Sequence, residues 1–154
     1  MADTIRKPMM LGTTEGRRLP VIGHEITVKL TAADTAGGAY VFEDVCPPGV
    51  GVPLHVHERE DEILTVLEGE YEIFLDGKTY TAHKGAVANF PRFVAHAFRN
   101  IGQQPARALF VVTPAESFAR FFEELSALPP NAPPAMIAEV FARYGMAILQ
   151  PQTA

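Results

Sequence analysis

The stretch that decides the fold runs from Gly49 to Gly69 and reads GVGVPLHVHEREDEILTVLEG. His55 and His57 stand two residues apart in it, and in a β-strand this spacing places both imidazoles on the same face. Glu62 begins the apolar run that follows. A carboxylate at the start of a buried strand is energetically costly unless a cation or a hydrogen-bond network stabilises it. The stretch therefore predicts two strands with a place for a metal cation.

A fourth candidate ligand, His96, begins the predicted strand 96–100, which follows a turn. Three imidazoles and one carboxylate form a mixed nitrogen and oxygen set that suits Fe(II), Mn(II), Ni(II), Cu(II) or Zn(II). Such a set leaves coordination positions open for water or substrate. We therefore expect one divalent transition metal ion, held by His55, His57, Glu62 and His96, in a functional site.

Short strands separated by turn residues are predicted throughout the first 113 residues, which is typical of an all-β barrel or sandwich. Asp76-Gly77 separates two of these strands and predicts a type I′ hairpin, because both residues tolerate positive φ. Besides the strand that carries His55 and His57, the predicted strands cover residues 24–31, 40–46, 63–67, 70–75, 78–82, 86–90, 96–100 and 107–112.

After Thr113 the pattern becomes helical. Thr113-Pro114-Ala115-Glu116 has the arrangement of a capping box and predicts a helix that begins at Pro114. A second helix is predicted from Asn131-Ala132-Pro133-Pro134 to just before Gly145. We expect an N-terminal arm over residues 1–22, a barrel over 23–113 and a C-terminal helical appendage over 114–154. Two helices cannot form a core alone, so they should pack on the barrel or on a partner subunit.

Two motifs of the chain resemble those of the cupins. The first is Gly49-x5-His55-x-His57-x4-Glu62-x6-Gly69, which is identical to the family pattern. The second is Gly85-x5-Pro91-x-Phe93-x2-His96-x3-Asn100, where Phe93 stands at the glycine position of the family. The resemblance implies a jelly-roll barrel, or double-stranded β-helix, with His55, His57, Glu62 and His96 at the metal-ligand positions.

A single cupin followed by a helical tail is also similar to the quercetin-dioxygenase-like cupins, which implies a metal-dependent dioxygenase that acts on a small molecule. Glu62 is a candidate catalytic residue, because it could serve as a general base by loosening its bond to the metal. Two alternatives stay open: a cupin that binds a small ligand without turnover, and a metal-dependent isomerase or decarboxylase. The sequence does not identify the metal or the substrate.

The amino-acid composition limits the kinds of partner that we expect the protein to bind and the cell compartment in which we expect it. Thirteen Lys and Arg against eighteen Asp and Glu give a formal charge of −5, which argues against nucleic-acid binding. No apolar run is long enough for a membrane helix. A single cysteine and a first segment without the apolar core of a signal peptide favour the cytoplasm. The mean hydropathy of +0.07 is high for a small domain, so we expect a homodimer that buries apolar surface.

The remaining polar and aromatic residues are assigned to ordinary structural roles. Glu58, Glu60 and Asp61 are expected to form a solvated rim, with Asp61 on the opposite strand face from Glu62. His24 and His83 are expected at the surface, and Cys46 in the interior. An aromatic set could line an apolar pocket, although core packing explains most of it: Phe42, Tyr71, Phe74, Phe93, Phe98 and Phe110.

Overall fold

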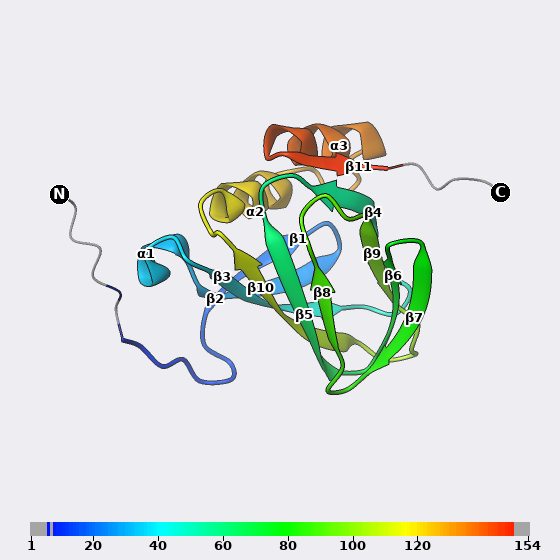
Figure 1. Ribbon diagram of the computed structural model, residues 1–154, viewed down its shortest axis with the longest axis horizontal. Helices are drawn as coiled ribbons and strands as arrows, with labels where there is room; N and C mark the ends of the chain where they lie inside the picture. Colours follow the sequence, from blue (N-terminus) through cyan, green and yellow to red (C-terminus); the bar gives the residue numbers. More distant parts are fainter. Residues whose placement is uncertain (1–5, 7, 150–154) are drawn as a thin grey trace.

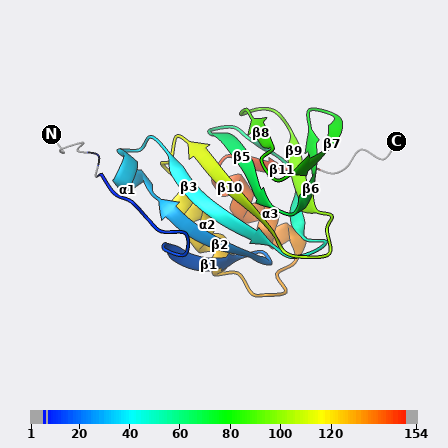
Figure 2. The same cartoon turned by 90° about the horizontal axis from the view of Figure 1, so that it is seen from below.

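The computed structural model describes residue 6 and residues 8–149 (Figure 1). One antiparallel sheet has the order β1 (Arg17–Val21), β2 (His24–Leu30), β3 (Tyr40–Cys46), β10 (Ala106–Thr113), β5 (Asp61–Glu68), β8 (Val87–Phe90). The other has the order β11 (Met146–Ile148), β4 (Gly51–His57), β9 (His96–Asn100), β6 (Glu70–Leu75), β7 (Lys78–His83). The two sheets form the expected jelly-roll barrel, with the apolar core between them (Figures 1 and 2).

The strands form where apolar and polar residues alternate, because alternate side chains point to opposite faces of a sheet. Burial alternates along all of β3 and β10, and their inward residues Phe42 and Phe110 stack with ring centroids 4.8 Å apart. The hairpin between β6 and β7 is confirmed: Asp76 and Gly77 have φ values of 49° and 77°, as a type I′ turn requires.

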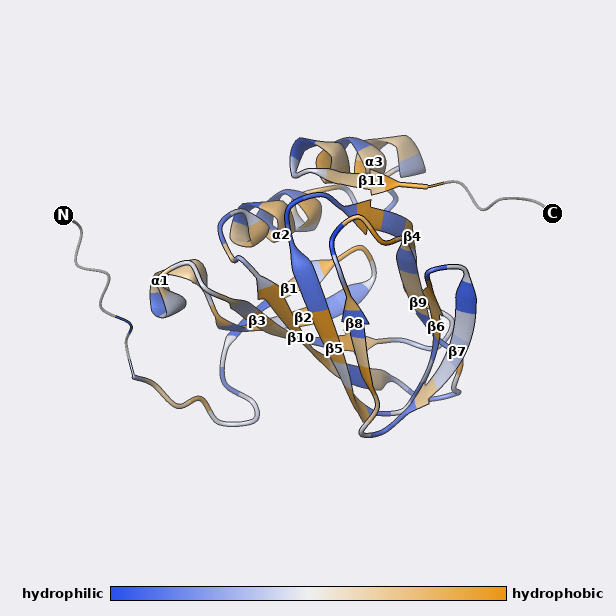
Figure 3. Cartoon of the chain, viewed as in Figure 1, coloured by the Kyte–Doolittle hydropathy of each residue, from blue (hydrophilic) through white to orange (hydrophobic). Residues whose placement is uncertain are grey.

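Two C-terminal helices lie across one end of the barrel (Figure 1): α2 (Phe118–Ser126) and α3 (Pro134–Arg143). A short helix, α1 (Ala32–Thr35), connects β2 to β3. Figure 3 shows apolar and polar residues mixed along α2 and α3, and most of the large apolar ones pack on the core, with Met136 exposed. None of the helices in the described chain is long and apolar enough to cross a membrane.

The predicted start of the first C-terminal helix at Pro114 is wrong. Thr113 still pairs with Asp61 as the last residue of β10, so its backbone continues the sheet and it does not begin a helix. The helix begins four residues later, after Ser117. The predicted end of the second helix is confirmed, since α3 stops just before Gly145, whose φ is 72°.

The segments on either side of the barrel also contribute strands. β1 lies in the predicted arm and pairs with β2, and its Leu19 and Val21 belong to the core. β11 follows α3 and pairs with β4, which carries His55 and His57. The sequence did not predict these two short strands. Residues 1–5, 7 and 150–154 of the expected arm and appendage lie outside the described residues.

The barrel core contains an ion pair. His24 was expected at the surface, but its side chain is 3% exposed, and its Nδ1 lies 3.0 Å from both carboxylate oxygens of Asp44. Burial alone would lower the pKa of His24. The hydrogen bond to Asp44, with a smaller contribution from Cys46, outweighs burial and raises this pKa to about 10. His24 is therefore charged at neutral pH, and Cys46 is buried as predicted.

This pair predicts a pH dependence of stability. The folded-state pKa of His24 is raised from 6.5 to about 10, so its contribution is complete below pH 6.5 and is lost as the pH rises through 10. We expect the free energy of unfolding to lose roughly 1.4 kcal/mol per pH unit across this window from this group. Urea denaturation at several pH values measures the slope.

A His24→Gln variant should lack this slope, whereas His83→Gln, a replacement of an exposed histidine in β7, should keep it. Equal slopes in the wild type and His24→Gln would contradict the assignment. If His24→Gln does not fold, the histidine proton resonances of the wild type still decide, because those of His24 should not titrate between pH 6 and 9.

Candidate metal centre

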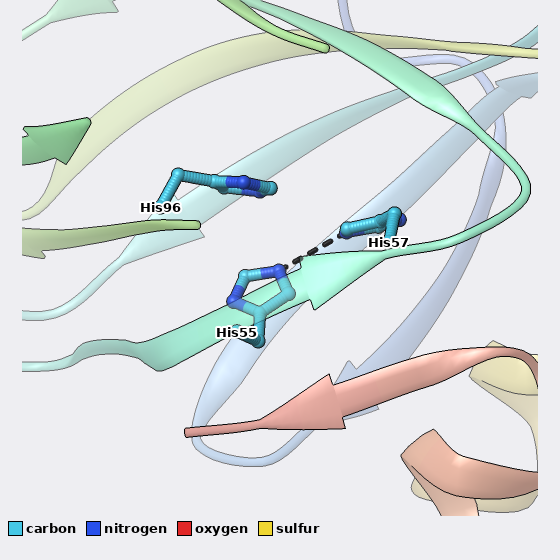
Figure 4. A group of neighbouring side chains, drawn as sticks. All are labelled: His55, His57 and His96. Atoms are coloured by element: carbon cyan, nitrogen blue, oxygen red, sulfur yellow. Dashed lines mark hydrogen bonds between the residues drawn. The ribbon is translucent and has the colours of Figure 1, made fainter. Parts of the chain in front are cut away.

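Three histidines meet inside the barrel at one end of the second sheet. His55 and His57 point inward from β4, and His96 is the register partner of His55 on the adjacent strand β9. One ring nitrogen from each lies within 4.8 Å of the others, and all three side chains are buried (Figure 4). The two-residue spacing and the strand pairing therefore produce the predicted cluster of imidazoles.

Hydrogen bonds orient each ring through its Nδ1. His55 Nδ1 donates to the carbonyl of Pro53 at 2.8 Å, and His96 Nδ1 donates to the carbonyl of Val94 at 3.1 Å. These partners assign the Nδ1–H tautomer to both rings, which leaves a lone pair on each Nε2. His55 Nε2 lies 3.1 Å from His57 Nε2, and His96 Nε2 is buried without a hydrogen-bond partner among the described residues.

The surroundings favour neutral rings at two of the three positions. Burial, with the neighbouring His96 and His57, lowers the pKa of His55 well below its usual value. Burial, with a contribution from His57, lowers the pKa of His96 to about 4. Burial also acts to lower the pKa of His57, but Glu60 and Glu62 outweigh it and raise that pKa. Neutral imidazoles with free lone pairs are the form in which histidine binds a metal.

Glu62 lies on β5, in the opposite sheet, and borders the same internal cavity as His55 and His57. It stands outside the compact group of three histidines. Burial raises its pKa to about 7, although the nearby His57 acts in the opposite direction. The structure thus groups three of the four predicted ligands tightly and places the fourth at the edge of their cavity, where its role as a ligand stays a prediction.

Glu60 was expected in a solvated rim, but it is only 3% exposed. Its Oε2 accepts a hydrogen bond from His57 Nδ1 at 3.3 Å, and its Oε1 accepts one from the hydroxyl of Ser117 at 3.3 Å. Glu60 therefore fixes the orientation of His57 and connects it to the start of α2. The sequence offered one signal, a carboxylate three residues after His57, but the buried environment comes from α2, which is distant in sequence.

The other two rim residues lie nearer to solvent. Glu58 is exposed, as expected. Asp61 is half-buried, and both of its carboxylate oxygens accept hydrogen bonds from the Arg92 guanidinium, at 3.2 and 3.0 Å. The hydrogen bonds from Arg92 lower the pKa of Asp61. Asp61 is thus committed to a surface ion pair.

Phe93 preserves the turn before His96 although it replaces the glycine of the cupin pattern. Its φ is 67°, a left-handed conformation that glycine adopts easily and phenylalanine rarely. Its N–H donates to the carbonyl of His57 at 2.7 Å, and the residue is 69% exposed. The backbone at Phe93 therefore adopts the left-handed conformation that a glycine at this position would allow, with local backbone strain as the only consequence.

Aromatic side chains surround the cluster and the cavity beside it, which has a volume of about 60 Å³. Three of the six expected aromatic residues line the cavity, namely Phe42, Phe98 and Phe110, whereas Tyr71, Phe74 and Phe93 do not. The C-terminal helices add four that the sequence did not assign to it: Phe118, Phe121, Phe122 and Phe141. Phe118 lies nearly parallel to His57, with ring centroids 6.2 Å apart.

Comparison with known proteins places this geometry in a family. The family model described as "Cupin domain" matches residues 42–112. A quercetin 2,3-dioxygenase of Bacillus subtilis (strain 168) is 32% identical over 97 residues, which is 61% of this chain and 28% of that protein. Protein SchB of Streptomyces halstedii is 32% identical over 94 residues, covering 60% of this chain and 67% of SchB.

Among solved structures, a predicted oxalate decarboxylase from Thermotoga maritima superposes with a TM-score of 0.63 at 26% identity, over 69% of this chain and 99% of that one. The chain spans less than half of the length of several curated relatives, 28% in the case of the quercetin dioxygenase. Both cupin motifs, the two-sheet barrel and these relatives agree. The chain belongs to the cupin superfamily.

Proposed function

We propose that this chain is a small-molecule metalloenzyme of the dioxygenase type that holds one divalent transition metal ion with His55, His57, His96 and Glu62. The observation that carries the proposal is the Nε2 atom of His96, a buried nitrogen beside the other two imidazoles that has no hydrogen-bond partner in the described part of the chain (Figure 4). A buried polar atom without a partner is costly, and a metal ion in the cluster would remove that cost.

The donor set fits such an ion. Imidazole nitrogens with one carboxylate suit Fe, Mn, Ni, Cu or Zn, and the Nδ1 hydrogen bonds hold each ring in place, as is usual around bound metals. When bound, a metal of this kind polarises a substrate oxygen, and in redox-active cases it also organises dioxygen. Glu62 completes the set from the opposite sheet.

The remaining residues have separate tasks in this proposal. The phenylalanines of the barrel and of α2 exclude water and give the cavity an apolar lining. Glu62 is the carboxylate that borders the cavity, and in this proposal it is the general base that takes a proton from a bound substrate. Glu60 holds the Nδ1 proton of His57 and so keeps the Nε2 lone pair turned toward the cluster.

The likeness to a quercetin 2,3-dioxygenase supports oxidation of an organic substrate by dioxygen. The likeness to a predicted oxalate decarboxylase supports a second candidate, a metal-dependent reaction that needs no dioxygen. The proposal also includes a homodimer, because the described surface exposes the large side chains of Tyr80, Val87 and Phe93. A cytoplasmic location is part of the proposal on a separate ground, the single cysteine of the chain. Light scattering tests the dimer, and a particle of 16.8 kDa would contradict it.

The first prediction from the proposed metal site concerns the metal content of the protein. Protein purified without an affinity tag should contain about one transition-metal ion per chain by elemental analysis, or should bind one on reconstitution. His55→Ala and His96→Ala should each weaken binding by more than 100-fold, because loss of a ligand costs more than the 10–100-fold of changes around it. His83→Ala is the control, since His83 is exposed on β7. Protein without metal that also fails to bind any added metal would refute the proposal.

The second prediction concerns Glu60. Glu60→Gln should reduce metal affinity about 10–100-fold, because the carboxylate that orients His57 becomes neutral. Glu58→Gln, a change in the same loop at an exposed position, should leave affinity unchanged. In the Zn(II)-loaded protein, the His57 Nδ1–H resonance should also move upfield in Glu60→Gln. Equal affinities and an unmoved resonance would show that Glu60 has no role in positioning His57.

The third prediction separates the two candidate reactions. The protein loaded with Fe(II) or Ni(II) should consume dioxygen in an oxygen-electrode assay with flavonols, catechols or diketones, and His57→Ala should not. Product formation from the same substrates without oxygen would favour the isomerase or decarboxylase alternative. Metal binding with no turnover in either condition would indicate a ligand-binding cupin.

A further inference from the structure

The cavity beside the histidine cluster is too small for the body of an organic substrate. Its volume is about 60 Å³, whereas an engineered apolar cavity that binds benzene measures about 150 Å³. His55 and His57 line the cavity, together with Ile22 of the turn between β1 and β2 and Leu125 of α2. A ligand that reaches the histidines therefore needs additional space outside this cavity.

That space lies next to two of the residues that line the cavity. A surface groove of about 440 Å³ runs between the β1–β2 turn and the linker that joins α2 to α3, residues 127–133 (Figure 2). Ile22 and Leu125 line both the groove and the cavity, so their side chains stand between the two spaces. Apart from Gly23 and Ser126, the groove is lined by proline, leucine, isoleucine and alanine, and none of these described residues carries a charge.

Two features of this boundary favour its opening. Ile22 has a φ of 41°, a left-handed conformation that a β-branched residue rarely adopts, so the turn is strained at this position. On the other side of the groove, every hydrogen bond of the linker within the described chain joins residues between Glu123 and Ile137, and none reaches the barrel. A movement of the linker away from the β1–β2 turn therefore breaks no hydrogen bond to the barrel.

We propose that this groove is the entrance to the metal centre, and that it holds the uncharged, apolar body of the ligand while the polar end reaches the histidines past Ile22 and Leu125. The continuity of the groove with the cavity and its uncharged lining argue for this occupant. A charged group in the groove is disfavoured, because the lining offers no partner for the charge. The inference rests on the proposed metal centre.

The association rate of benzohydroxamate with the Co(II)-loaded protein tests the entrance. A hydroxamate chelates a divalent metal through two oxygens, and the visible absorption of Co(II) changes when its ligands change. Ile22→Gly removes one side of the boundary at a position whose φ already suits glycine, so this variant should fold. It should bind the probe about tenfold faster, because binding that requires a conformational change is slow.

A tryptophan in the groove should have the opposite effect. Ala132→Trp fills the groove from the linker and should slow the association of benzohydroxamate about tenfold. Ala135→Trp is the matched control, because Ala135 is exposed on α3 and does not line the groove. Its association rate should equal that of the wild type.

Metal-free protein separates the groove from the metal centre. Benzyl alcohol, an uncharged ring without a chelating group, should shift the methyl resonances of Leu125, Leu128 and Ile137, whereas benzoate should not, because its charge has no partner in the groove. The shifts should be lost in Ala132→Trp and kept in Ala135→Trp. If Ile22→Gly or Ala132→Trp does not fold, the two probes on the wild type still decide.

The possible outcomes are distinct. Unchanged association rates in Ile22→Gly and Ala132→Trp, or equal shifts with benzyl alcohol and benzoate, would overturn this inference alone. Shifts with benzyl alcohol in a protein that binds neither Co(II) nor benzohydroxamate would count against the metal centre and not against the groove as a site for uncharged ligands. If Ala132→Trp instead dissociates a dimer in light scattering and changes neither probe, the groove is an interface between copies of the chain and the inference is wrong.

Discussion

Three imidazoles are buried together inside an apolar barrel, and one of their nitrogens, His96 Nε2, has no hydrogen-bond partner among the described residues; the rest of the structure depends on this constraint. In each ring, Nδ1 forms a hydrogen bond with a fixed acceptor. For His55 and His96 this acceptor is a backbone carbonyl. The Nε2 atoms of His55 and His57 then lie 3.1 Å apart, and that of His96 has no hydrogen-bond partner within residues 8–149. The described residues thus leave one of these nitrogens, His96 Nε2, unsatisfied, which is the arrangement expected of a site built for a cation.

The surrounding elements hold this arrangement in place. The pairing of β4 with β9 sets His55 opposite His96, and β11 pairs with β4 on its other edge. Helix α2 brings Phe118 against His57 and, through Ser117, supports Glu60. The helical tail is therefore part of the site's environment, and the barrel positions the ligands only together with it.

Much of the barrel and of the histidine cluster was predictable from the sequence, because these features depend on residue spacing within single strands and turns. The His-x-His pattern in a strand, the Asp-Gly turn and the alternation of β3 and β10 act over a few residues. What could not be predicted depends on packing between distant segments. The sequence suggested that His24 and Glu60 are exposed, but both are buried, and their hydrogen-bond partners Asp44 and Ser117 lie 20 and 57 residues away in the chain. The sequence also did not predict that four phenylalanines of α2 and α3 line the cavity, because the apolar face of a helix does not indicate which surface the helix covers.

X-ray absorption spectroscopy of the metal-loaded protein tests the central claim most directly, because it counts the ligands of the ion itself. The account predicts a first shell at about 2.0–2.1 Å for a metal such as Zn(II), with the outer-shell scattering of three imidazoles. The same spectrum from His96→Ala should show two imidazoles. A shell of oxygen atoms only, without imidazole scattering, would contradict the claim that His55, His57 and His96 hold the metal.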